Sequence, residues 1–122
     1  MHRFVDNGDG TVTDSCTGLM WQKNTAPGSH TWTQALQYCE SLTLAGRTDW
    51  RLPNVRELQS ILDYGRINPS IDPVFGAESG WYWSSTTIVA NPLSAWIVSF
   101  ANSLAVFEGK DRASGVRAVR TS

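Results

Sequence analysis

Apolar residues recur at helical spacing in the segment 55–62, and the residues before this segment carry helix-start signals. Asn54 precedes the pattern and Glu57 stands three residues later, which is the arrangement of a capping box. Pro53 favours an extended approach, because its ring fixes its own φ and restricts the residue before it. Gly65 supplies a stop signal, so the pattern predicts an amphipathic helix of about three turns. Its apolar positions are Val55, Leu58, Ile61 and Leu62.

A second helical pattern begins after Thr31. Thr31 can cap this helix together with Gln34 in the capping-box position, and Gly46 lies near its end. The apolar residues of the pattern share one face, which we expect to contact the core. They are Trp32, Ala35, Leu36, Cys39 and Leu42.

The remaining chain alternates in the manner of β-strands. Residues 4–14 predict a hairpin with its turn at 6–10, and residues 16–22 predict a strand that follows it. Residues 65–80 contain several Pro and Gly and predict a connector without regular structure. The second half then predicts an antiparallel meander with turns at 91–92, 102–103 and 109–115, so the fold class is α+β. The predicted strands are 81–87, 95–101, 104–108 and 116–121.

Length and charge narrow the function classes. The chain has 122 residues, which corresponds to one domain over residues 1–122, and its net charge is −1 with a pI near 6.0. This balance argues against a nucleic-acid partner, because a duplex-binding protein normally carries a basic face. No apolar stretch approaches the length of a membrane span, so we expect no membrane insertion, and no signal-peptide core follows the first residues.

The cysteines and the acidic turn give no metal site. Cys16 and Cys39 are too few for zinc, and His2 and His30 do not complete a ligand set. The turn at 6–10 fails the EF-hand spacing, because its third position is Gly8 and no glutamate follows in reach. We favour a disulfide between Cys16 and Cys39, with two buried free thiols as the alternative. We expect no metal and no cofactor.

Several motifs together resemble one known family. The sequence is similar to the Lcl C-terminal domain family in five motifs, which occur in the expected order along nearly the whole chain. They are Gly18 to Gln22, the helix with Trp32 and Cys39, Asp49 to Leu58, Tyr82 to Thr86, and Val116 to Arg120. The resemblance implies a C-type-lectin-like fold of the formylglycine-generating-enzyme type, with two helices flanking a twisted antiparallel sheet. Some relatives are adhesive tips that bind sulfated glycans, and others resemble the variable proteins of diversity-generating retroelements.

The residues do not predict an enzyme. Ser84 and Ser85 lack the sequence context of a nucleophile elbow, and neither histidine is placed to activate them. Arg51 and Arg117 have no nucleophile–base pair beside them in the sequence and are read as structural residues. The implied fold does not carry the formylglycine-generating activity, because that chemistry needs cysteines in the C-terminal half and this chain has none after Cys39.

The C-terminal strands predict an exposed recognition surface. If Trp96, Val98 and Phe100 face the core, alternation turns Ala95, Ile97, Ser99 and Ala101 outward. On the next strand Ala105 and Phe107 would face inward and Leu104, Val106 and Glu108 outward. An error of one residue in this register, or a neighbouring subunit on this face, is the open alternative. The predicted ligand-binding residues are Ile88, Val89, Asn91, Leu93, Ile97, Ser99, Ala101, Ser103, Leu104, Val106, Glu108, Lys110, Asp111, Arg112 and Ser114.

Two functional hypotheses follow. In the first, the protein is a ligand-binding module with a variable surface, and its partner is a protein because the outward residues are apolar and mixed. In the alternative, it is a surface adhesin domain that binds sulfated glycans, which would require a cluster of Lys and Arg. The family resemblance favours a location on a cell surface or a virion, and some adhesive relatives are trimeric, so a homo-oligomer is compatible with either hypothesis.

Overall fold

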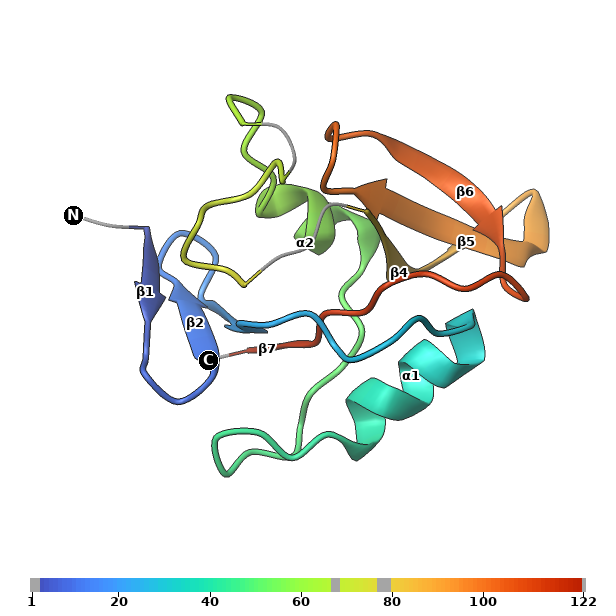
Figure 1. The fold of residues 1–122 in the computed structure, drawn as a ribbon. Coiled ribbons are helices and arrows are strands. Elements are labelled where there is room, and N and C mark those ends of the chain that lie inside the picture. Colours follow the sequence, from blue (N-terminus) through green and yellow to red (C-terminus); the bar gives the residue numbers. More distant parts are fainter. Residues whose placement is uncertain (1–2, 67–68, 77–79, 122) are drawn as a thin grey trace.

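A computed structural model describes residues 3–66, 69–76 and 80–121 of the chain. In these residues seven strands form two antiparallel sheets, and two short helices pack between and beside them (Figure 1). The coarse prediction of an α+β fold is therefore confirmed. Residues 67–68 and 77–79 of the predicted connector lie outside the described residues.

The first sheet joins the two ends of the chain. Its order is β1-β2-β3-β7, with β7 from the C-terminus beside β3 from the N-terminal region. The hairpin predicted for residues 4–14 is confirmed, with Phe4 opposite Asp14. The third strand is shorter than predicted, because residues 15–18 form the turn that precedes it. The strands are β1 (Phe4–Asp6), β2 (Thr11–Asp14), β3 (Leu19–Gln22) and β7 (Val119–Thr121).

The second sheet is a three-stranded meander of order β4-β5-β6. It consists of β4 (Trp81–Ile88), β5 (Asn91–Ser99) and β6 (Ala105–Gly109). Asn91 and Pro92 were predicted to form a turn, but they begin β5 and the turn lies at residues 89–90. The register places Ile97 between Trp83 on β4 and Val106 on β6.

The last predicted strand does not continue this meander. After β6 the chain crosses back through the molecule, and Gly115 pairs with Tyr82 before the chain enters the first sheet as β7. Val119 exchanges two backbone hydrogen bonds with Arg51, at 2.9 Å each. The prediction of one sheet for the second half was wrong, because alternation within a strand does not reveal its partner.

Both helices begin at the predicted capping boxes. In α1 (Trp32–Ser41) the Gln34 N–H donates to Thr31 Oγ1, and in α2 (Val55–Ser60) the Glu57 N–H donates to Asn54 Oδ1 at 2.8 Å. α2 is shorter than the predicted three turns. Helical geometry ends at Ile61, and Leu62 forms a β-bridge with Ile71. The apolar spacing continued because Ile61 and Leu62 are both buried, although not in the helix.

The core consists of two clusters on opposite faces of the second sheet. Tyr82 and Val98 belong to the cluster that includes Trp21, Leu58 and Phe100. Trp83 and Ile97 belong to the other, which includes Cys39 of α1. The central strand β5 is therefore covered on both faces. Among the described residues no helix is long and apolar enough to cross a membrane.

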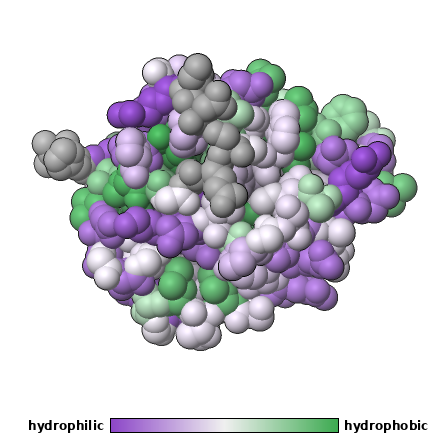
Figure 2. Space-filling model, in the orientation of Figure 1, coloured by the Kyte–Doolittle hydropathy of each residue, from purple (hydrophilic) through white to green (hydrophobic). Residues whose placement is uncertain are grey.

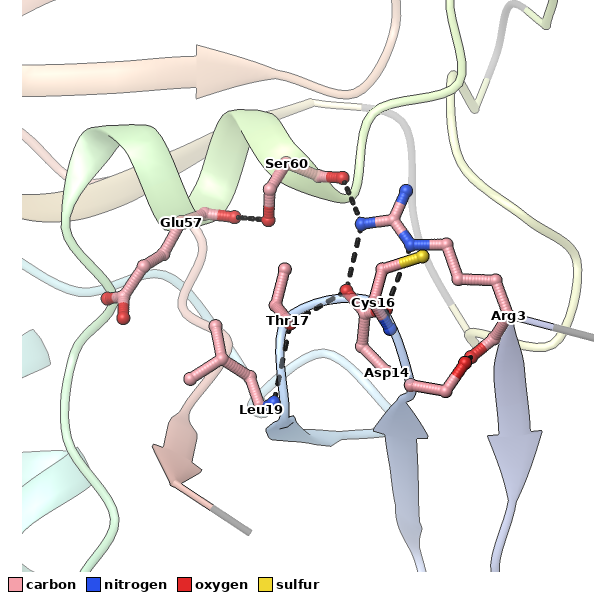
Figure 3. A network of polar contacts seen from close by, with 8 residues as sticks. Arg3, Asp14, Cys16, Thr17, Leu19, Glu57 and Ser60 are labelled. Carbon is pink, nitrogen blue, oxygen red and sulfur yellow. Dashed lines mark hydrogen bonds and ion pairs between the residues drawn. The ribbon is translucent and has the colours of Figure 1, made fainter.

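A polar network ties the N-terminal hairpin to α2 (Figure 3). Arg3 donates to both carboxylate oxygens of Asp14, at 2.9 and 2.8 Å, and to the backbone carbonyl of Ser60 at 2.9 Å. Asp14 also accepts hydrogen bonds from the Thr17 hydroxyl and the backbone N–H of Cys16. This network fixes the turn before β3 against the C-terminal end of α2.

Candidate functional site: one end of the second sheet

Three segments that are distant in the sequence converge at one end of the molecule. The turn between β4 and β5, the segment after β6, and the start of α1 all lie at the right of Figure 1. The Trp32 N–H donates to the Lys110 carbonyl at 3.1 Å, and His30 and Ser114 exchange two backbone hydrogen bonds of 2.9 Å. These bonds hold the segment after β6 against the residues that precede α1.

A cleft of about 430 Å³ opens on the α1 side of the second sheet. Trp81 forms part of its wall with its side chain partly exposed, and Thr25, Ser29 and Ser114 contribute hydroxyl groups. Ile97, Val106 and Glu108 of the predicted surface also line it. Aromatic, apolar and hydroxyl groups together are a composition that suits a ligand with both apolar and polar parts.

A second cleft, of about 620 Å³, lies beside the start of α1. Lys110 lines it, and its ammonium lies 3.9 Å from the Trp32 ring centroid and 3.0 Å from the Thr87 hydroxyl. The cation–π contact and the hydrogen bond hold this side chain against the protein. Three other predicted ligand-binding residues, Asn91, Leu93 and Asp111, also line this cleft, together with Ser94.

About half of the predicted surface residues are exposed. The exposed residues extend from the β4–β5 turn across β6 to the segment after it: Val89, Asn91, Leu93, Leu104, Val106, Asp111 and Arg112. A further group is half-buried: Ile88, Ala101, Ser103, Glu108 and Lys110. In Figure 2 hydrophobic side chains gather at the upper right, over the region of β5 and β6, with hydrophilic side chains beside them.

Three of the predicted ligand-binding residues are buried instead, and so is Ala95, which was also predicted to face outward. Ile97, Ser99 and Ser114 expose 3, 1 and 8% of their surface. Phe107 shows the opposite error, because it was predicted to face inward and is 63% exposed. The alternation rule assumes that one face of a strand contacts the core and the other meets solvent. Here both faces of β5 are covered, whereas the edge strand β6 has exposed side chains on both of its faces. Phe107 and Trp81 are thus site residues that the sequence reasoning missed.

The run of apolar residues at 104–107 was a signal for the missed Phe107. A strand with apolar residues at consecutive positions is either covered on both faces or has an exposed apolar side chain on one of them. Trp81 opens the alternating motif Trp81-Tyr82-Trp83, whose outer members share one face of the sheet. This pattern indicates that Trp81 and Trp83 lie on the same face of the sheet. It does not indicate where along that face the residues that cover it end.

Of the two serines considered as nucleophiles, Ser84 has a structural partner. Ser84 is buried, and its hydroxyl donates to the Trp96 carbonyl at 2.7 Å. His30 contacts the Pro27 carbonyl through Nε2 at 3.0 Å and packs against Tyr38. In residues 3–66, 69–76 and 80–121 no three His, Cys, Asp or Glu side chains are placed to hold a metal ion.

Arg51 and Arg117, which were interpreted as structural residues, lie in the scaffold. Arg117 is fully buried, donates to the carbonyls of Gln22 and Lys23, and lies over the Phe75 ring. Burial lowers the pKa of its guanidinium to about 10. Arg51 forms a two-bond ion pair with Glu57, with both distances at 2.7 Å. Neither arginine lines the clefts beside β6.

The favoured disulfide was wrong, because both cysteines are free thiols. Cys39 lies on the buried face of α1 within the core cluster beside Trp83, whereas Cys16 lies exposed in the turn before β3. The alternative of two buried thiols holds for Cys39 only. The prediction failed because burial on a helix face indicates contact with the core but not with a particular turn.

A comparison with models of protein families gives a match. The sequence model described as the Lcl C-terminal domain matches residues 10–120, which is nearly the whole chain. A search of curated proteins gave no match.

Proposed function

Because the chain belongs to the Lcl C-terminal domain family, we propose that it is a ligand-binding module whose C-terminal strands and adjoining loops recognise the partner. One observation carries this proposal. Five of the exposed large apolar side chains belong to the β4–β5 turn, β5, β6 or the residue before β6: Val89, Leu93, Leu104, Val106 and Phe107. A gathering of exposed apolar side chains usually marks an interaction site.

The partner that this surface fits best is a protein. The charged residues beside the apolar side chains are mixed in sign, with Glu108 and Asp111 next to Lys110 and Arg112. Lys110 is held against Trp32, which leaves it less free to contact a polyanion. A sulfated glycan would require a concentrated positive charge, and the mixed charges make an adhesin for such glycans the weaker candidate.

We infer that the finer fold is C-type-lectin-like, of the formylglycine-generating-enzyme type. Support comes from the two capped helices beside antiparallel sheets and from the family to which the chain belongs. In this proposal the molecule acts by binding and not by catalysis, which agrees with the structural roles of Ser84 and His30.

We further propose that the surface is diversified, as in the variable proteins of diversity-generating retroelements. The arrangement suits variation, because exposed positions such as Val106 and Phe107 lie on the edge strand β6, beside a buried scaffold on the neighbouring strands that includes Trp83 and Val98. Sequencing the DNA around the gene tests this point. An imperfect copy of the segment for residues 86–121, differing at adenine codons and accompanied by a reverse-transcriptase gene, is expected; a locus without such a copy would make the surface a fixed interface.

Affinity capture tests the binding function itself. Immobilised wild-type protein is exposed to a cell-envelope extract from the organism that carries the gene, beside the triple variant L93S/V106S/F107S. The matched control is V5S/Y64S, which removes exposed apolar side chains away from the clefts. We expect the wild type and the control to retain the same protein and the triple variant to lose it. Retention by all three would contradict the proposed surface.

Retention on heparin separates the glycan alternative. Binding to a polyanion through Lys and Arg weakens steeply as salt rises. We expect no retention even at low ionic strength, whereas strong retention that falls between about 50 and 300 mM salt would favour the adhesin.

A further inference from the structure

β6 is an edge strand whose outer backbone groups are open. It pairs with β5 and with no other strand among the described residues. The Ser99 N–H donates to the Leu104 carbonyl and the Lys110 N–H to the Leu93 carbonyl, so residues 104, 106, 108 and 110 direct their backbone groups toward β5. The backbone groups of Ala105 and Phe107 therefore point away from the sheet.

This edge lacks several of the features that usually prevent another strand from pairing, and Glu108 is the one charged residue of the strand. The sequence of β6 contains neither Pro nor Lys, and its pairing with β5 has no bulge. Val106 and Phe107 are 39 and 63% exposed and project from opposite faces. The strand thus offers open hydrogen-bonding groups together with apolar side chains on both faces.

A cleft adjoins β6 on each face of the sheet. Val106 and Glu108 line the cleft on the α1 side. On the other face Ala105 and Trp96 line a cleft of about 380 Å³ that also contains Arg56. An added strand would direct alternate side chains to the two faces, and therefore toward the two clefts in turn.

We propose that the partner contributes an extended polypeptide segment that pairs antiparallel with β6. This inference rests on the proposed function and names the form of the ligand. The segment has a basic residue opposite Glu108, an aliphatic residue opposite Val106 and an aromatic residue opposite Phe107. The aromatic residue continues the cross-strand pair of Trp96 and Phe107.

The charges beside β6 favour such a partner over a second copy of this chain. The Glu108 carboxylate accepts a hydrogen bond from the Gly109 N–H and has no ion pair within the described residues, and Arg56 on the other face has none either. Antiparallel self-pairing centred on Phe107 would bring two Glu108 side chains to diagonal positions on one face without a cation between them. A partner with a base facing Glu108 and an acid facing Arg56 satisfies both groups.

A synthetic peptide tests the backbone pairing directly. The probe is the labelled peptide Ser-Thr-Lys-Phe-Val-Glu-Ser, in which Lys is placed opposite Glu108 and Phe opposite Phe107. N-methylation of the peptide Phe removes an N–H that would donate to β6, whereas N-methylation of the adjacent Val alters an N–H that would point away. By fluorescence anisotropy we expect the first change to weaken binding at least tenfold and the second less than twofold. Equal effects of the two would overturn strand addition.

Variants of the protein provide the reciprocal test. F107P removes an outward N–H at an edge position where proline is tolerated, and near-ultraviolet circular dichroism verifies its fold. F107P should lose peptide binding, and E108K should prefer a peptide with Glu in place of Lys by at least tenfold. Absence of binding by every peptide, while wild-type capture still depends on Leu93, Val106 and Phe107, would overturn strand addition and retain the proposed function. Sedimentation showing a dimer that F107P converts to a monomer would assign the edge to a second copy instead.

Discussion

The two cysteines show how burial separates residues of the same chemistry. Cys39 is buried against the core, and burial, with a smaller contribution from the charge of Glu40, raises the pKa of its thiol to about 12. Cys16 lies exposed in the turn before β3. Because the thiolate is the reactive species, the two side chains should differ strongly in reactivity.

Thiol labelling should therefore distinguish them. We expect a maleimide reagent at neutral pH to modify Cys16 in the folded protein without a reductant, and Cys39 only after denaturation. Mass spectrometry of peptides from both states checks this result, with C16S as the control that should remain unlabelled when folded. A folded protein without any reactive thiol would contradict the free state of Cys16.

Asp14 is a buried carboxylate whose partners determine its ionisation. Burial alone would raise the pKa of Asp14, but the hydrogen bonds from Arg3, Thr17 and the Cys16 N–H outweigh it and lower this pKa. The folded state consequently binds fewer protons at Asp14 than the unfolded state does. Its stabilisation is present above the ordinary value of 3.8 and is lost as the pH falls through the folded-state pKa.

Substitution D14N should expose this pH dependence. At pH 6 we expect a loss of about 2–3 kcal/mol in the free energy of unfolding, because the variant leaves the Arg3 guanidinium without its charged partner. The difference from wild type should shrink below about pH 4. Urea unfolding between pH 6 and 2 measures it, and D49N, which alters an ion pair with an exposed carboxylate, serves as a control with little effect. A difference that stays constant down to pH 2 would contradict the role of the ionised carboxylate.

At the scale of elements, the sequence was most informative where the determinants are local. Both capping boxes were correctly predicted, because Thr31 with Gln34 and Asn54 with Glu57 each lie within one turn of helix. The end of α2 was not, because it depends on the β-bridge between Leu62 and Ile71.

Substitution N54A should destabilise the protein through α2. Asn54 accepts the Glu57 N–H at 2.8 Å, and the six residues of α2 offer few other hydrogen bonds to compensate for its loss. We expect the free energy of unfolding to fall by about 1 kcal/mol in N54A and by much less in N54D, which retains a capping oxygen. Chemical denaturation of both variants decides the point; equal losses would show that capping is not the cause.

The exposure of side chains in the second sheet cannot be predicted from the local sequence. Ile97 and Val106 are cross-strand partners on the same face, yet one is 3% and the other 39% exposed. Their difference arises from α1 and the segment 114–118, which cover β5 but leave the edge at β6 open. Alternation within either strand contains no information on this cover.

A matched pair of substitutions tests where the scaffold ends and the surface begins. I97S should lower the free energy of unfolding by about 3–4 kcal/mol, because it leaves a cavity and buries a hydroxyl. V106S should lower it by less than about 1 kcal/mol, since the side chain is already partly hydrated. Thermal and urea unfolding of the two variants provide the comparison. Similar losses would mean that Val106 belongs to the core, and the proposed binding surface would have to be redrawn.

At the scale of the whole molecule, the N-terminal and C-terminal regions of the chain pair in one sheet. β7 forms the edge of the first sheet beside β3 and also bridges to Arg51, while Arg117 two residues earlier binds the carbonyls of Gln22 and Lys23. The motif at 116–120 was recognised from sequence, but its place in the N-terminal sheet was not, since that pairing joins residues about 100 positions apart. The candidate surface predicted from the sequence lies on three strands that do form one meander, whereas the fourth predicted strand belongs to the other sheet.

Removal of β7 should consequently unfold the molecule as a unit. A chain that ends at Ala118 loses the pairing with β3 and the bridge to Arg51, together with Val119 of the core. We expect it to show no cooperative transition by circular dichroism or tryptophan fluorescence. The control R120A/T121A keeps the backbone of β7 and Val119 and should unfold cooperatively. If the shortened chain unfolds with the same midpoint as the control, the second sheet folds without the first, and the binding surface would be an independent unit carried by residues 81–109.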